Sequence, residues 1–160
     1  MGGNGARDAY LSGTLNKFLK DLFRAVGDIG GIKVLTVIGK KNKSIPMNSF
    51  TSGTYYITKP NNTKQITNIA FYDKNGGIKT SIDMVYNPDG SLKPFTVSYK
   101  NGVPKPEGTH MHSWPRNGQG DYGRVSHDPK NIKPVNRYYM RFVNKALKYN
   151  AKHVVKKLRK

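Results

Sequence analysis

Cysteine is absent from the 160 residues of the chain. Its absence excludes disulfide bonds, thiolate zinc sites and cysteine nucleophiles. Long hydrophobic runs are missing too, since no apolar segment reaches the length of a transmembrane helix. The first residues, MGGNGARDAY, lack the apolar core of a secretory signal. We therefore expect any export to use a specialised route or a longer precursor chain.

Acidic side chains are few: 9 Asp and Glu stand against 28 Lys and Arg, which gives a formal net charge of +19. Such an excess goes beyond what solubility requires and indicates a polyanionic partner, such as RNA, DNA, an anionic membrane surface or an acidic protein. The scattered acids form no convincing catalytic pair, and no GxSxG or P-loop motif is present. The length suits one domain, which we place at 13–160 after a loose, glycine-rich segment at 1–12.

Hydrophobic periodicity predicts an α+β fold. Apolar residues at helical spacing predict an N-terminal helix at about 13–26, and β-branched runs predict strands at 32–38 and 54–58. Three further strands separated by Asn-Gly and Asp-Gly turns predict a small antiparallel β-sheet. This predicted meander, with one buried face, comprises 66–72, 78–86 and 95–100. The segment at about 134–159 is expected to be a long basic C-terminal helix.

Basic residues recur every three or four positions along that C-terminal helix, among them Arg141, Lys145 and Lys148, and no acid follows Asp128. Like charges on one face repel one another, so a sequence selected for helix stability alone would interleave Glu. The basic stripe therefore favours phosphate binding. A solvated face and a membrane-surface helix are the alternatives.

The strongest candidate for chemistry is the segment 107–124, EGTHMHSWPRNGQGDYGR. In an extended chain His110 and His112 point to the same side, with Trp114 beside them as a wall. Imidazoles titrate near neutral pH, which suits acid–base chemistry. A polar loop that happens to hold two histidines is the plain alternative.

Metal-independent RNA cleavage needs a base for the ribose 2′-hydroxyl, an acid for the leaving 5′ oxygen and cations around the phosphate. The leading hypothesis assigns base and acid to His110 and His112 and uses no cofactor or metal ion. Tyr72 or Tyr122 would orient the substrate or donate a proton. Lys64, Arg116 and Arg124 would clamp the phosphate, Arg124 as one of the catalytic groups, and Trp114 and His127 are further candidates for substrate contact. The hypothesis requires the imidazoles to open onto the same space as the basic surface.

A metal-dependent nuclease would use the same imidazoles. His110 and His112 would ligate a divalent ion, and an acid or a further histidine would complete the shell. The candidates for that third ligand are Asp83, Asp121, His127 and Asp128.

The segment ITNIAFYDKNGGIKTSID, followed after an insert by THMHSW, resembles a C-terminal toxin domain of bacterial polymorphic toxins and of some phage head-morphogenesis proteins. These domains look like members of the barnase/EndoU/colicin-like RNase assemblage. The resemblance covers residues 64–127 and points to Tyr72, Asp73, Asp83, His110, His112 and Trp114. It implies endoribonuclease activity, with Asp83 among the catalytic groups, and an acidic immunity protein as partner.

The resemblance also implies secretion, or delivery into the cytoplasm of a target bacterium. The chain departs from the family pattern by an extra hairpin at 87–102 and by its basic C-terminal helix. A toxin-type endoribonuclease is thus the leading hypothesis. A non-enzymatic nucleic-acid-binding or phage structural module, in which the histidines only pack, is the competing class, and a membrane-active basic protein is a third. The target RNA and the oligomeric state are left open.

Overall fold

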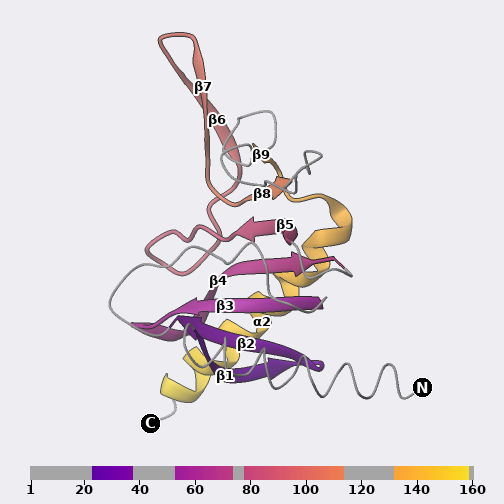
Figure 1. Cartoon of the computed structure of the whole chain (residues 1–160). Helices are drawn as coiled ribbons and strands as arrows, with labels where there is room; N and C mark the ends of the chain where they lie inside the picture. Colours follow the sequence, from indigo (N-terminus) through magenta and orange to yellow (C-terminus); the bar gives the residue numbers. More distant parts are fainter. Residues whose placement is uncertain (1–22, 38–52, 74–77, 114–131, 159–160) are drawn as a thin grey trace, which may run out of the picture.

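The computed structural model describes residues 23–37, 53–73, 78–113 and 132–158 of the chain. Its largest element is a seven-stranded sheet with a long helix, α2 (Arg137–Leu158), across one face (Figure 1). In sheet order the strands are β1 (Phe23–Ile29), β2 (Ile32–Val37), β3 (Gly53–Lys59), β4 (Asn62–Tyr72), β5 (Ile78–Asp83), β8 (His110–Ser113) and β9 (Ile132–Lys133).

This architecture corrects the predicted fold class. The predicted helix at 13–26 is wrong at its described end, because Phe23 begins strand β1, which pairs antiparallel with β2; residues 13–22 lie outside the described ranges. The sheet is also larger than the predicted antiparallel meander, and it is mixed, because β2 and β3 run parallel. The long C-terminal helix is present as α2. It is the one helix within the described ranges, so strands rather than helices dominate the described fold.

A tight turn explains why the first described segment is a hairpin. Gly30 and Gly31 both have positive φ angles, 58° and 91°, which side chains other than glycine rarely adopt. Two such residues between paired strands form the turn that matches strand twist. The amide of Gly31 also donates to Asp28 Oδ1 at 2.8 Å. The turn therefore sets β1 beside β2.

The chain leaves the main sheet after β5 and returns to it at β8. In between, β6 (Thr96–Lys100) and β7 (Val103–Glu107) pair only with each other, as a hairpin that projects from the sheet (Figure 1). The predicted third strand of the meander, 95–100, therefore lies in this hairpin, and β8 takes the place beside β5. Thr109 closes the base of the excursion: its hydroxyl accepts from the amide of Val85 at 3.1 Å and donates to the Val85 carbonyl at 3.2 Å.

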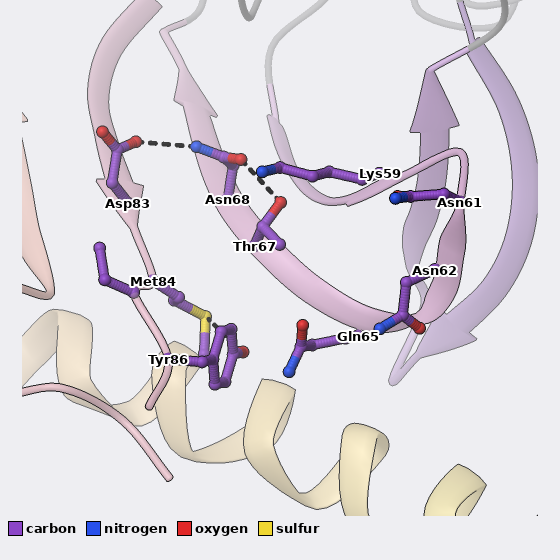
Figure 2. Close-up of a pocket in the computed structure, with 10 residues that line it drawn as sticks. Lys59, Asn61, Asn62, Gln65, Thr67, Asn68, Asp83, Met84 and Tyr86 are labelled. Carbon is purple, nitrogen blue, oxygen red and sulfur yellow. Dashed lines mark hydrogen bonds between the residues drawn. The ribbon is translucent and has the colours of Figure 1, made fainter. Parts of the chain in front are cut away.

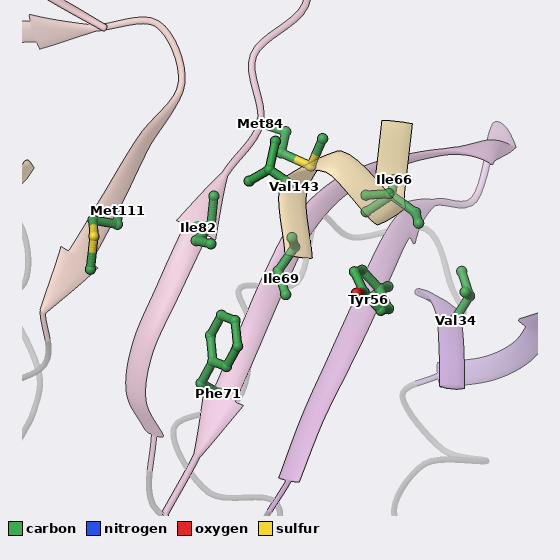
Figure 3. Packing of buried hydrophobic residues seen from close by; sticks show 10 residues of the cluster. Val34, Tyr56, Ile66, Ile69, Phe71, Ile82, Met84, Met111 and Val143 are labelled. Carbon is green, nitrogen blue, oxygen red and sulfur yellow. The ribbon is translucent and has the colours of Figure 1, made fainter. Parts of the chain in front are cut away.

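Both faces of the central strands carry clusters of buried hydrophobic side chains. On one face, aliphatic and aromatic side chains of β2–β5 and β8 pack beneath α2, where Val143 and Ala146 are fully buried (Figure 3). Phe71 contributes through edge-on contacts with Tyr139 and Phe142, each with ring centroids 4.9 Å apart. A second cluster on the opposite face comprises Phe23, Leu35, Ile57, Ala70, Tyr72 and Ile78.

Helix α2 is anchored at its start and near its end. Asn136 caps it, since its side-chain oxygen accepts from the Tyr139 amide at 3.0 Å. Asn150 accepts from the Ile66 amide at 2.9 Å and donates to the Tyr86 hydroxyl at 2.9 Å. These bonds fix the helix against β4.

Within the described ranges, no helix combines the length and the apolar character needed to span a membrane.

Candidate metal centre

Strand register brings three potential ligands together. Asp83 on β5 pairs directly with His110 on β8, and His112 lies two residues further along β8. Met111, between the histidines, packs in the cluster beneath α2. Because neighbouring strand residues alternate, both imidazoles point to the face opposite α2. The predicted shared orientation of His110 and His112 is thus confirmed.

The three side chains meet at single atoms. His110 Nε2 and His112 Nε2 are 2.9 Å apart. Asp83 Oδ2 lies 3.2 Å from His110 Nε2 and 3.1 Å from His112 Nε2. The exposed fractions of the side chains are 35% for Asp83, 15% for His110 and 9% for His112, so the carboxylate is the most accessible of the three.

A backbone carbonyl fixes the tautomer of His110. Its Nδ1 lies 2.7 Å from the Gly108 carbonyl oxygen, which only accepts hydrogen bonds, so Nδ1 carries a proton and donates it. When the ring is charged, Nε2–H donates to Asp83 Oδ2, and loss of that proton leaves the Nε2 lone pair facing Asp83 and His112. Gly108 has a φ of 81°, and a side chain there would overlap the Pro94 carbonyl, so this close approach requires glycine.

Asp83 is held by a partner on its other side. Asn68 pairs with Asp83 in register, and its Nδ2 donates to Asp83 Oδ1 at 2.8 Å. The Thr67 hydroxyl donates to Asn68 Oδ1 at 2.8 Å and so fixes the amide orientation. Sequence reasoning missed Asn68. Counting back from the Tyr72–Ile78 pair would place it opposite Ile82, and the register shift between Phe71 and Tyr72 moves it opposite Asp83.

The hydrogen bonds also set the electrostatics of the cluster. Burial acts to raise the pKa of the Asp83 carboxyl, but hydrogen bonds from His110 and His112 and their charge outweigh it and hold that pKa well below its usual range. The Asp83 hydrogen bond raises the pKa of His110, against the opposing effect of burial. Asp83 is therefore a carboxylate at neutral pH.

The spacing of the three atoms fits one ion. Metal–nitrogen and metal–oxygen bonds of about 2.1 Å, meeting at angles between about 90° and 109°, place neighbouring ligand atoms about 3.0–3.4 Å apart. The observed separations run from 2.9 to 3.2 Å. A histidine ligand usually donates its other ring N–H to a carbonyl or carboxylate, as His110 does to Gly108. The cluster therefore could hold one metal ion, with Gly108 supporting His110.

The same spacing does not suit the base and acid of in-line RNA cleavage. In that reaction the attacking and leaving oxygens lie on opposite sides of phosphorus. A base and an acid must each stand a hydrogen bond of 2.7–3.2 Å beyond those oxygens. Nitrogen atoms 2.9 Å apart leave no room for a phosphate between them.

Other predicted site residues lie elsewhere. Tyr72 is on the site face of β4, but it is only 8% exposed and packs edge-on against Tyr55, with ring centroids 6.0 Å apart. Lys64 is exposed near the start of β4. The helix residues Arg141, Lys145 and Lys148 are exposed on α2, which covers the opposite face of the sheet. The structure therefore does not bring the helix cations to the histidines.

Several predicted residues lie outside the described ranges, and the structure places none of them. They are Trp114, Arg116, Asp121, Tyr122, Arg124, His127 and Asp128.

A pocket of about 550 Å³ adjoins the cluster and shares Asp83 and Asn68 with it (Figure 2). Its wall runs from the β3–β4 turn along β4 to the end of β5. The other lining residues are Lys59, Asn61, Asn62, Gln65, Thr67, Met84, Val85 and Tyr86. We call this space the amide pocket.

Comparisons of the chain with protein-family models, with curated proteins and with solved structures found no match.

Proposed function

We propose that this protein is a nuclease that cleaves phosphodiester bonds, RNA being the preferred substrate, at a divalent metal ion held by Asp83, His110 and His112. One observation carries the proposal: the three ligand atoms form a nearly equilateral triangle with sides of 2.9, 3.1 and 3.2 Å. Asn68 and the Gly108 carbonyl hold two of those ligands in place. The preference for RNA over DNA comes from the resemblance described above.

The ligand set favours one class of ion. Mg²⁺ and Ca²⁺ prefer shells made of oxygen atoms, whereas imidazole suits first-row ions such as Zn²⁺ and Mn²⁺. Two histidines and one carboxylate leave further coordination positions open for water or substrate, as catalytic sites require. An ion there would stabilise the negative charge that develops on a phosphate oxygen in the transition state.

The charge of the chain supports a nucleic-acid substrate. A net charge of +19 attracts polyanions and favours rapid, salt-sensitive binding. Among the described Lys and Arg residues, Lys59 lines the amide pocket, as Asp83 does. The ion would then supply the positive charge at the scissile phosphate that the cations of α2 do not reach.

The toxin setting belongs to the same proposal. An acidic immunity protein would find electrostatic complementarity on a chain of this charge. Delivery into a target bacterial cytoplasm follows from the resemblance alone.

Metal titration tests the site directly. The full chain, stripped with EDTA and dialysed, should bind one Zn²⁺ or Mn²⁺ ion in isothermal calorimetry. Asp83→Asn and His112→Ala should abolish this binding, whereas Asn68→Ala, which keeps all three ligands, should weaken it by roughly 10–100-fold. His153→Ala is the matched control, because His153 Nδ1 bonds to the Tyr149 carbonyl within α2.

The same preparations should cleave single-stranded RNA when the ion is restored, and EDTA should stop the reaction. Failure to bind any first-row ion would overturn the metal centre. Stoichiometric binding without RNA or DNA cleavage would leave the metal centre standing and refute the nuclease.

A metal-free nuclease is the second candidate. The Asp83 carboxylate bonds to Nε2 of both imidazoles, and His110 Nδ1 already donates to the Gly108 carbonyl, so Asp83 would orient His112 as the base. Cleavage that persists in EDTA but is lost in His112→Ala would favour this version.

A further inference from the structure

The amide pocket lies next to the candidate metal centre, and Asp83 belongs to both. Asp83 contributes one carboxylate oxygen to the centre, while the other accepts from Asn68. Asp83 and Asn68 both line the pocket, so the two spaces share a wall (Figure 2). A molecule held in the pocket would therefore lie directly beside the proposed ion.

The pocket has the size and chemistry of a site for a small polar group. Its volume of about 550 Å³ falls within the range of roughly 300–1,000 Å³ that is typical of ligand sites. Four amide side chains from the β3–β4 turn and β4 line it: Asn61, Asn62, Gln65 and Asn68, the last of which donates to Asp83. Each amide offers a donor and an acceptor side by side, which matches the edge of a nucleobase.

Two of these amides have no competing partner among the residues that the structure describes. Within the described part of the chain, neither Asn61 nor Gln65 makes a side-chain hydrogen bond. The Asn62 oxygen accepts from the Lys64 amide at 3.3 Å, a bond that orients this side chain at the turn. The lining thus presents polar groups that the described part of the fold does not use.

A cation completes the lining. Lys59 extends over the pocket toward Asn68 and Thr67 (Figure 2), and it forms no ion pair within the described ranges. A lysine beside a base-sized polar pocket is placed to meet the phosphate that every nucleotide carries. Tyr86 lines the other end, with its hydroxyl bonded to Ile66 and to Asn150.

We infer that the amide pocket receives one unpaired nucleotide of single-stranded RNA, so that Asn61 and Gln65 read its base edge and Lys59 contacts its phosphate. The inference rests on the proposed nuclease function and names what selects its substrate. Unpaired bases expose their hydrogen-bonding edges, and amide side chains read such edges in proteins that recognise single-stranded RNA. The pocket would thereby fix which nucleotide lies next to the scissile bond.

Binding in EDTA tests the pocket separately from cleavage. Four short single-stranded oligoribonucleotides are used, each containing a single type of base. Their binding to the full chain is measured by fluorescence anisotropy at low salt. The wild type should prefer one base by about tenfold or more, which is the discrimination of one or two good base contacts. The double variant Asn61→Ala/Gln65→Ala should lose this preference while retaining general affinity. Lys59→Gln should weaken all four oligonucleotides alike.

Two exposed residues away from the pocket provide matched controls: Asn144→Ala on α2 and Lys100→Gln on the β6–β7 hairpin should leave the base preference unchanged. Equal binding of the four oligonucleotides by the wild type, or an unchanged preference in the double variant, would overturn the inference. EDTA-sensitive cleavage by the same variants would then still support the nuclease. Conversely, the protein could show a base preference that depends on Asn61 and Gln65 but cleave no nucleic acid. That result would support the amide pocket as a nucleotide site and refute the nuclease function.

Discussion

Tyr56 is fully buried in β3, yet its hydroxyl has no hydrogen-bond partner within the described part of the chain. A buried hydroxyl without a partner destabilises the folded state by about 1–3 kcal/mol relative to a paired one. Tyr56→Phe keeps the ring and removes that hydroxyl. We therefore expect it to raise the free energy of unfolding by about 1 kcal/mol and the melting temperature by about 2–4 °C.

Tyr86→Phe is the matched control, because the Tyr86 hydroxyl donates to the Ile66 carbonyl and accepts from Asn150. Its loss should lower the free energy of unfolding by about 1–2 kcal/mol. Urea denaturation of both variants measures the pair. Destabilisation by Tyr56→Phe would mean that its hydroxyl is bonded in solution.

The side chains of the candidate site were predictable to different degrees. The orientation of His110 and His112 followed from strand alternation, because residues two apart share a face. Asp83 was only one of four possible third ligands until strand register placed it opposite His110. The Gly108 carbonyl that orients His110 could not be predicted. It belongs to a residue with a positive φ angle, and no pattern of side chains reveals where a backbone carbonyl points.

Strands are specified by their partners as much as by their own periodicity, and β1 illustrates this. Apolar residues at helical spacing ran up to Val26 and predicted a helix, but Phe23–Ile29 is a strand. The two glycines after Ile29 form a turn, and β2 offers a ladder of backbone hydrogen bonds. Tertiary pairing of this kind overrides local helix preference, which is a weak guide by itself.

The β6–β7 hairpin is an element that the site does not need. Its strands pair only with each other, and Val97, Tyr99 and Val103 on it are exposed. Pro104 and Pro106 lack amide donors, which discourages another strand from adding to β7. Thr96 and Glu107 pair at its base, so a short Gly-Ser linker can replace Thr96–Glu107.

This replacement should change the free energy of unfolding of the sheet by less than about 1 kcal/mol, because shortening a loop alters closure entropy only slowly. Metal binding should be unchanged, since Gly108 and Thr109 are retained. Calorimetry for the ion and urea denaturation for stability provide the measurements. Loss of ion binding would show that the hairpin supports the site.

The molecule separates its basic helix from its candidate centre. Met111 packs beneath α2 while His110 and His112 face the other way, so the sheet lies between them. Arg141, Lys145 and Lys148 are exposed on the helix, and no ion pair occupies them within the described ranges. Under the proposed function these cations would therefore bind the phosphates of RNA but would not act on the scissile bond.

The triple variant Arg141→Gln/Lys145→Gln/Lys148→Gln should weaken RNA binding and reduce its salt dependence. For single strands, each phosphate contact contributes a slope of about 0.7 in log K against log salt, so three lost contacts should lower the slope by about 2. The ion stoichiometry and the cleavage rate at saturating RNA should stay unchanged, because the centre lies on the other face of the sheet.

A control with the same net charge separates a localised surface from the overall charge. Lys79→Gln/Lys93→Gln/Lys105→Gln removes three exposed cations from β5, the segment after it and the hairpin. Titrations of single-stranded RNA between 50 and 200 mM salt, a range over which phosphate contacts have large effects, compare the two variants. A larger slope change in the helix variant means that α2 contacts the phosphates directly. Equal changes would mean that only the total charge matters, and the helix would then not be the nucleic-acid surface.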